Sequence, residues 1–194
     1  MRVLIACEFS GVGREAFRAL GHDAWSCDLL PAEDNSSFHL QCDVLTILND
    51  GWDLMLAHPE CTYLARSGWR WVNAPDQSFL PLKGRPRLEA AQRGVEFFMK
   101  LLNAPIDKRA IENPRPSPHV KLPRSNQVIQ PWMFGHGETK ETHLWLKNLP
   151  PLMSTLIVSE RAGKVHRAPP GPNRWKDRAR SYPGILKAMA EQWS

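Results

Sequence analysis

A cysteine that follows a buried strand is the residue of this chain best suited to nucleophilic chemistry. Cys61 comes just after the apolar run Trp52–Ala57 and behind Pro59. This position places a side chain at an open strand end, where the reactive thiolate needs a positive neighbour that lowers its pKa, such as Arg66 or Arg109. The pattern predicts Cys61 as a catalytic nucleophile, with a packed structural thiol as the alternative.

A glutamate and an asparagine, Glu112 and Asn113, end the apolar run Arg109–Ile111 in the same way. In a parallel sheet this strand end would lie beside that of Cys61, so that both side chains can hold one planar ring. A carboxyl group buried in such a crevice has its charged form disfavoured and can stay protonated near neutral pH. We therefore expect Glu112 to donate a proton and Asn113 to bind the substrate, with an Asx-type turn as the alternative for Asn113.

Further residues at strand ends suit a nucleotide-type ligand. A glycine turn leads from the first strand into a helix and consists of Phe9, Ser10, Gly11, Val12 and Gly13. Glycine permits close approach of a ligand to the backbone, and the helix N-terminus offers N–H groups. Asp28 and Asp43 end the next two strands, where their carboxylates suit ribose hydroxyls and a ring or amine nitrogen. A tight turn without a ligand, and helix capping by either aspartate, are the alternatives.

The apolar runs alternate with segments of helical periodicity. We expect strands over Arg2–Cys7, Asp23–Cys27, Phe38–Val44, Trp52–Ala57 and Arg109–Ile111, and helices over Gly11–Leu20 and Arg87–Leu102. The apolar side chains of the second helix recur three and four residues apart, which gives it one buried face. This alternation predicts an α/β fold with a doubly wound, mainly parallel sheet, which binds ligands at the carboxyl ends of its strands.

The remainder of the chain is less regular. Four prolines favour an ordered loop over Asn113–Pro123, and a second rigid loop is expected over residues 168–172. Two more strands are expected over Val128–Met133 and Thr142–Leu146, and a final helix over Tyr182–Trp193. A length of 194 residues fits one domain.

The basic residues are concentrated in the C-terminal half. Residues 1–106 carry 10 Lys and Arg against 13 Asp and Glu, whereas residues 107–194 carry 15 against 7. A one-sided basic face is typical of proteins that bind phosphates, although it also serves solubility alone. The charge distribution therefore indicates a nucleic acid as partner, with a merely solvated surface as the alternative.

Other classes of protein are disfavoured by the same sequence. No apolar run approaches the roughly 20 residues that a membrane span requires, so we expect a cytoplasmic protein without membrane contact. The four cysteines form no CxxC pair. Buried free thiols are expected for Cys7, Cys27 and Cys42, and no metal site is expected.

Taken in chain order, the glycine turn, Asp28, Asp43, Pro59 with Cys61, and Glu112 with Asn113 resemble the cytosine-5 DNA methyltransferase family. The resemblance covers residues 1–115 and returns in the segment SYPGILKAMAEQW at residues 181–193. It implies the Rossmann-like fold of a class I S-adenosylmethionine-dependent methyltransferase. It also implies S-adenosyl-L-methionine as cofactor, held by the glycine turn together with Asp28, Leu29, Asp43, Val44 and Pro59.

The resemblance further implies that Cys61 adds to C6 of a cytosine before a methyl group is transferred to C5. A base in a duplex must be flipped out, or presented single-stranded, to react in this way. Arg66 and the two tryptophans Trp69 and Trp71 lie in a loop, residues 62–84, that can close over the base. We expect these three residues to bind the substrate, with packing of the tryptophans on the core as the alternative.

The chain departs from the family pattern in two respects. Glu60 replaces the usual second proline before the cysteine, and its charge is expected to raise the pKa of the nucleophile. The family's Gln- and Arg-rich motif is not recognisable, and residues 116–181 leave room only for a reduced recognition region between the core, residues 1–115, and the last helix, residues 182–194. This suggests a compact, phage-like member. Modification of a pyrimidine in RNA or in a free nucleotide, transfer of a group other than methyl, and a non-catalytic nucleic-acid-binding protein of the same fold are the alternatives.

Overall fold

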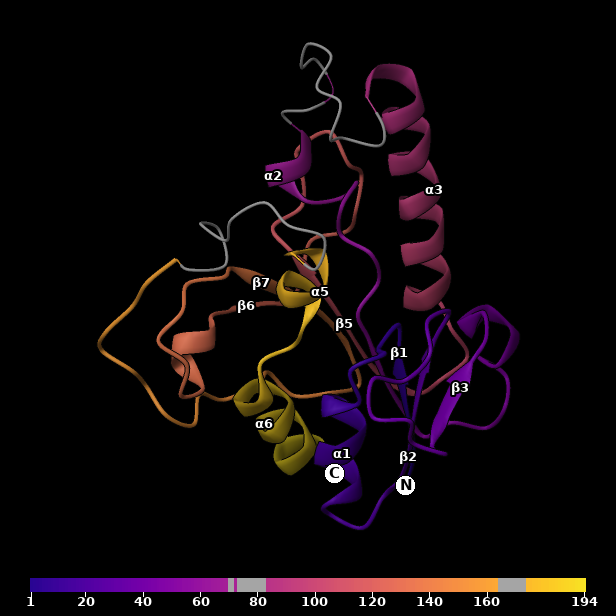
Figure 1. Ribbon diagram of the computed structural model, residues 1–194, viewed down its shortest axis with the longest axis vertical. Coiled ribbons are helices and arrows are strands. Elements are labelled where there is room, and N and C mark those ends of the chain that lie inside the picture. Colours follow the sequence, from indigo (N-terminus) through magenta and orange to yellow (C-terminus); the bar gives the residue numbers. More distant parts are fainter. Residues whose placement is uncertain (70–71, 73–82, 164–173) are drawn as a thin grey trace.

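The computed structural model describes residues 1–69, 72, 83–163 and 174–194 (Figure 1). The predictions for Trp71, for the loop over residues 168–172 and for most of the loop over residues 62–84 lie outside these residues.

A seven-stranded sheet runs through the middle of the molecule, in the strand order β3-β2-β1-β4-β5-β7-β6. Its strands are β1 (Arg2–Ala6), β2 (Asp23–Asp28), β3 (His39–Gln41), β4 (Leu54–Ala57), β5 (Lys108–Pro114), β6 (Gln127–Ile129) and β7 (Thr142–Lys147). The first five strands are parallel to one another, whereas β7 is antiparallel to both of its neighbours, β5 and β6.

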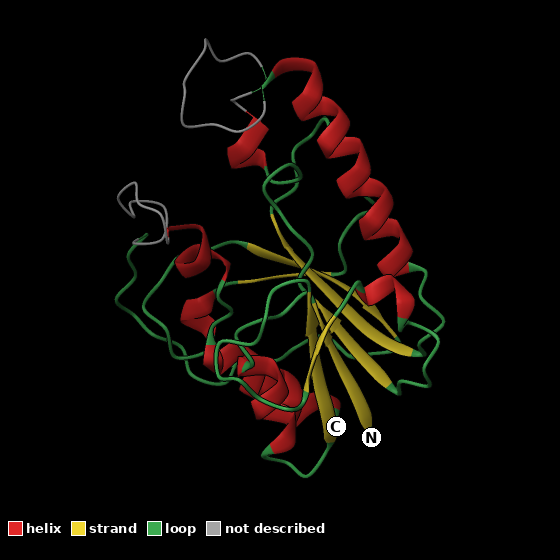
Figure 2. Ribbon diagram, turned by 45° about the vertical axis from the view of Figure 1, so that its right-hand side comes forward, coloured by secondary structure: helices red, strands yellow, loops and turns green. Residues whose placement is uncertain are grey.

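Helices cover both faces of this sheet (Figure 2). The described helices are α1 (Val12–Arg18), α2 (Arg66–Trp69), α3 (Gly84–Leu102), α5 (Arg174–Ala179) and α6 (Pro183–Trp193), with 3-10 turns at Val44–Thr46 and Pro131–Met133. The long helix α3 lies on one side of the sheet, and α1 and α6 lie on the other.

The two core layers follow from the alternation of side chains along the buried strands. Val3 and Ile5 of β1 face a cluster with Phe17 of α1 and Trp193 of α6. The intervening Leu4 and Ala6 face the opposite cluster, which contains Phe98 and Leu101 of α3. Because successive side chains of a strand point to opposite faces, a strand that is apolar throughout must be covered twice.

The predicted α/β fold with a Rossmann-like, mainly parallel sheet is confirmed, and the differences lie at element ends. The expected strand over Phe38–Val44 is reduced to β3, and that over Val128–Met133 to β6 and a 3-10 turn that starts at a proline. In contrast, β5 runs on through Asn113 and Pro114, where a loop was expected, because β7 supplies partners for them. The short helices α2 and α5 were not predicted.

Among the described residues, no helix combines the length and the apolar character that crossing a membrane requires.

Candidate active site

The carboxyl ends of five parallel strands meet at one edge of the sheet. Ala6 of β1 pairs with Cys27 of β2 and with Ala57 of β4, and Ala57 pairs in turn with Ile111 of β5. The residues that follow these positions therefore lie side by side. The expectation that the candidate side chains emerge at a common edge is correct.

Cys61 lies in a tight turn just beyond β4. The turn is closed by hydrogen bonds from the backbone N–H groups of Leu64 and Ala65 to the carbonyl of Cys61. Asn113 steadies the start of the turn, because its Nδ2 donates to the carbonyl oxygen of Pro59 at 3.3 Å. The sulfur of Cys61 is thus carried on a short, braced loop and is half-buried.

Charges around Cys61 pull its pKa in opposite directions. Burial, the largest effect, and the nearby Glu112 raise the pKa of the thiol. The positive charges of Lys140 and Arg178 lower it, and Glu60 raises it by the smallest contribution. The net pKa lies above the ordinary value, so Cys61 is a thiol at rest. The expected direction of the Glu60 effect is correct.

The two arginines that the sequence suggested as partners of Cys61 do not fill this role. Arg109 lies near the beginning of β5, at the opposite edge of the sheet, where it donates to the carbonyls of Leu102 and Ile106. Arg66 lies in α2 with its side chain exposed and is not among the groups that shift the pKa of the thiol. Arg109 is close to Glu112 in sequence, but the length of β5 separates the two side chains. The prediction for Arg109 was wrong because it did not take this separation into account.

Glu112 forms a close pair with a histidine that the sequence analysis did not single out. His58 directly follows β4, and its Nδ1 lies 3.3 Å from Oε2 of Glu112. Burial is the largest effect on the carboxyl and raises its pKa, but the hydrogen bond to His58 and the charges of Lys140 and His58 together outweigh it. The pKa of Glu112 therefore lies below its ordinary value. The expectation of a protonated Glu112 at rest is wrong, because burial was the only effect considered.

Asn113 is fully buried rather than open to a ligand. Its amide nitrogen donates a hydrogen bond to the carbonyl oxygen of Pro59, and its Oδ1 has no hydrogen-bond partner among the described residues. The bond to the loop that carries Cys61 gives Asn113 a supporting position in the site.

A small hollow of about 20 Å³ brings together the polar groups beside Glu112. Its lining includes His58, Lys140, Ser181 and Tyr182. Lys140 comes from the segment before β7, and its Nζ donates to the carbonyl of Arg178 at 3.2 Å. Residues from three distant parts of the chain thus surround the carboxylate of Glu112.

The glycine turn is held by an acid that precedes it. Glu8 is buried, and its Oε1 accepts hydrogen bonds from the backbone N–H of Gly13 at 2.7 Å and from the hydroxyl of Ser10 at 3.1 Å. Its Oε2 accepts from the backbone N–H of Arg14 at 3.3 Å. These helix N–H groups are therefore occupied within the protein. The expectation that they are available to a ligand is wrong for Gly13 and Arg14.

The two aspartates at the ends of β2 and β3 bind backbone groups close by in sequence. Oδ1 of Asp28 accepts from the N–H of Leu30, and Oδ1 of Asp43 caps the 3-10 turn through the N–H of Leu45, both at 3.0 Å. The capping alternative is thus realised for Asp43. The side chain of Val44 is buried in the core cluster and that of Leu29 is exposed.

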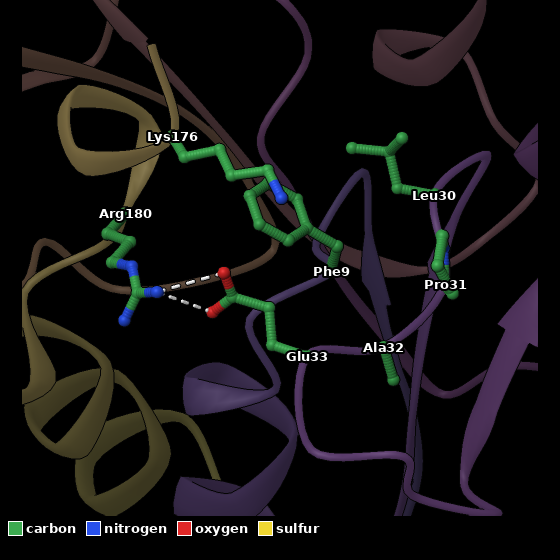
Figure 3. Close-up of a pocket in the computed structure, with 7 residues that line it drawn as sticks. All are labelled: Phe9, Leu30, Pro31, Ala32, Glu33, Lys176 and Arg180. Atoms are coloured by element: carbon green, nitrogen blue, oxygen red, sulfur yellow. Dashed lines mark hydrogen bonds and ion pairs between the residues drawn. The ribbon is translucent and has the colours of Figure 1, made fainter. Parts of the chain in front are cut away.

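A cavity of about 590 Å³ opens at the same edge, between the ends of β1 and β2 and the C-terminal segment (Figure 3). Phe9 and the segment from Leu30 to Glu33 form one wall, and Lys176 and Arg180 form the other. Figure 3 shows Lys176 reaching toward the ring of Phe9, with its Nζ 6.0 Å from the ring centre. Arg180 closes the wall by an ion pair with Glu33 at 2.8 Å. Of the predicted cofactor-binding residues, only Phe9 lines this cavity.

Trp69 packs within the protein. Its ring stacks on that of His119 with the ring centres 4.9 Å apart, and it contacts the core cluster beneath α3. This arrangement agrees with the packing alternative for Trp69.

Sequence reasoning missed the cations of the site and the acid of the glycine turn. Lys140 and Arg178 lie about 80 and 120 residues from Cys61 in the chain and have no local pattern. Glu8 and His58 do carry a signal, since each directly follows a buried strand. Among the described residues, no group of three or more His, Cys, Asp or Glu side chains is arranged to hold a metal ion.

A solved structure described as a DNA modification methyltransferase encoded within a prophage (E. coli) is similar to this chain, with a TM-score of 0.50 and 12% sequence identity. The match covers 81% of this chain and 52% of the other, so this chain spans about half the length of that structure. At this identity the similarity concerns the fold. No protein-family model and no curated protein sequence matches the chain. The architecture that the chain shares with that structure is a Rossmann-like α/β fold.

Proposed function

We propose that the protein is an S-adenosyl-L-methionine-dependent DNA methyltransferase that methylates C5 of cytosine through a covalent adduct of Cys61. The observation that carries this proposal is the meeting of Cys61 and Glu112 just beyond the last paired residues of β4 and β5, close enough for the charge of Glu112 to raise the pKa of the Cys61 thiol. The cavity beside Phe9 lies at the same edge of the sheet.

The residues of the large cavity fit a nucleoside cofactor with a charged amino-acid tail. Its volume lies within the range of roughly 300–1,000 Å³ that is typical of small-molecule sites. Phe9, Leu30 and Pro31 offer an apolar surface for a ring, and Lys176 is a cation at the rim that suits a carboxylate. Asp28 and Asp43, which border this edge, are the candidates for polar contacts to the ribose and the base. When bound, the cofactor supplies the sulfonium methyl group that C5 accepts.

Glu112 is an ionised carboxylate at rest, so it can take the proton of the Cys61 thiol. The thiolate then adds to C6 of the cytosine, while the same proton passes from Glu112 to N3. This makes the ring an enamine whose C5 is nucleophilic. After methylation the C5 proton leaves to solvent, Cys61 departs from C6, and the proton on N3 returns through Glu112 to the sulfur.

The substrate is proposed to be DNA with a flipped or single-stranded cytosine. The net charge of +8 over residues 107–194 supports a polyanionic partner. Within the reduced recognition region, β6 and β7 belong to the sheet, which leaves the segments outside these strands to contact the DNA. Arg66, exposed beside the catalytic loop, is the proposed contact to the substrate backbone.

The test is a covalent trap. DNA that carries 5-fluorocytosine blocks loss of the C5 substituent, so the wild-type protein with S-adenosylmethionine should give a denaturant-stable adduct. Cys61→Ala should give none, and the matched control Cys42→Ala, which removes another half-buried thiol, should give the full amount. Glu112→Gln should lower the rate of adduct formation far more than the affinity for the cofactor.

An adduct that persists in Cys61→Ala would overturn the assignment of the nucleophile. Cofactor binding without an adduct on DNA, but with one on 5-fluorocytosine RNA, would make RNA the substrate. Cofactor and DNA binding without an adduct on any substrate would favour the non-catalytic alternative.

A further inference from the structure

His58 is the side chain that forms a hydrogen bond with the Glu112 carboxylate. Ala57 and Ile111 form the last pair of the β4–β5 ladder, and His58 and Glu112 are the residues that follow them. The side chains of His58 and Glu112 therefore leave the sheet on the same face. The backbone N–H of His58 still donates to Ala6, which ties the residue to the sheet. Only 11% of its side chain is exposed.

The proton of this pair can be placed from the chemistry of the acceptor. Glu112 is ionised, and an ionised carboxylate only accepts hydrogen bonds, so Nδ1 of His58 carries a proton. The hydroxyl of Ser181 lies 3.5 Å from the same nitrogen. Nε2 is buried and has no hydrogen-bond partner among the described residues. The imidazole is therefore anchored through Nδ1 alone, on the side that faces Glu112.

Charged and titratable groups from several elements face Glu112 in the described part of the chain. His58 comes from the end of β4 and Lys140 from the segment before β7, and both favour the ionised form. Cys61 shares the site as a thiol, and Tyr182, at the start of α6, lines the same hollow. Burial raises the pKa of Glu112, so the contributions of His58 and Lys140 decide that it lies below the ordinary value.

The state of this carboxylate decides which base it recognises. An ionised carboxylate accepts from the 4-amino group of cytosine, but it repels the oxygen that uracil and thymine carry at the same position. A protonated carboxyl group can donate to that oxygen and loses the distinction. Polar sites of this kind reject the wrong partner strongly, because a buried group would be left unpaired.

We propose that His58 is a positioning residue for Glu112, which holds the carboxylate ionised and oriented so that the site accepts cytosine and rejects uracil and thymine. The inference rests on the proposed function, because it names the feature that selects the base in that reaction.

The test compares His58→Leu, which removes the donor, with His58→Asn, whose amide can donate from nearly the position of Nδ1. In the leucine variant the pKa of Glu112 should rise, so the acid limb of the kcat/KM profile for cytosine methylation should move to higher pH by about one unit or more. At a pH between the acid limb of the wild type and that of the leucine variant, the leucine variant should show a roughly tenfold lower preference for 5-fluorocytosine over 5-fluorouracil in adduct formation. The asparagine variant should stay close to wild type in both measurements.

The matched control is His143→Leu. His143 forms a histidine–glutamate pair with Glu141 at 2.9 Å and is similarly buried, but it neither lines the hollow beside Glu112 nor shifts the pKa of that carboxyl. Its removal should leave the acid limb in place. Cofactor-dependent thermal stabilisation checks the folding of each variant, and His58→Ser, which admits water, replaces the leucine variant if that chain does not fold.

An unchanged acid limb and an unchanged base preference in a folded His58→Leu, or in His58→Ser, would overturn the role of His58 and leave the methyltransferase proposal intact. Failure of the wild-type protein to methylate or trap cytosine would instead overturn the proposed function.

Discussion

The buried Glu8 carboxylate determines how firmly the glycine turn is held, and its removal has a calculable cost. The side chain is 4% exposed and accepts from the N–H groups of Gly13 and Arg14 and from the hydroxyl of Ser10. Both N–H groups belong to the start of α1, where no preceding turn of helix can accept them. Glu8→Ala removes the acceptor and leaves these groups in a buried place without water.

The expected cost follows from the two N–H groups. Each buried donor without a partner costs about 1–3 kcal/mol, so the loss of both partners in Glu8→Ala should lower the free energy of unfolding by about 2–6 kcal/mol. For a chain of this length, each kcal/mol corresponds to a change in Tm of about 2–4 °C, so Tm should fall by roughly 4–24 °C. Glu8→Gln keeps one acceptor oxygen and should cost about 1–2 kcal/mol.

Urea denaturation and calorimetry measure these differences directly. The control is Glu89→Ala, which removes an exposed glutamate paired with Arg85 on α3 and should change stability by at most about 0.5 kcal/mol. Equal losses for Glu8→Ala and Glu89→Ala would refute the view that the turn depends on this carboxylate. Cofactor affinity should weaken together with stability in Glu8→Ala, because the same turn borders the large cavity.

Two further predictions concern the start of α6. A Cβ at Gly184 would overlap the carbonyl oxygen of Phe134, so Gly184→Ala should cost more than about 2 kcal/mol, whereas Gly94→Ala, whose Cβ would approach the Leu64 side chain no closer than 3.1 Å, should be nearly neutral in urea denaturation. His136 accepts a hydrogen bond from the N–H of Gly184 at 2.9 Å through Nε2, and burial lowers its pKa below 6.5. Because the unfolded chain then binds the proton more tightly, this stabilisation is complete above pH 6.5 and is lost as the pH falls through the lowered pKa. His136→Gln, which keeps an acceptor, should remove that part of the pH dependence, and an unchanged pH profile of stability would contradict this assignment.

The C-terminal segment joins the two halves of the site. Arg180 contacts Glu33 at the large cavity, and the next residue, Ser181, contacts His58 beside Glu112. Lys140 is bonded to the carbonyl of Arg178 in the same segment. The large cavity and the groups that lower the pKa of Glu112 are therefore linked by a few consecutive residues of this segment.

The chain order of the first five strands and the placement of Cys61 and Glu112 at one edge of the sheet followed from the sequence alone. Apolar runs such as Trp52–Ala57 identify strands that are buried on both faces, and a parallel sheet must bring the carboxyl ends of such strands to one edge. The type and order of the residues at those ends were sufficient to predict the fold and the edge of the sheet at which these residues meet. They were not sufficient for the antiparallel pairing of β7, which extended β5 through Asn113 and Pro114.

Only the tertiary structure decided the charge states of the site. Burial suggested a protonated Glu112, yet His58 and Lys140 keep it ionised, and the partners of Cys61 proved to be Lys140 and Arg178 rather than Arg66 and Arg109. A pKa depends on distances between groups that are remote in the chain, and these distances are set by how the last third of the sequence folds back over the strand ends. Residue types place the reacting groups along the chain, but the balance of burial against neighbouring charge exists only once the chain is folded.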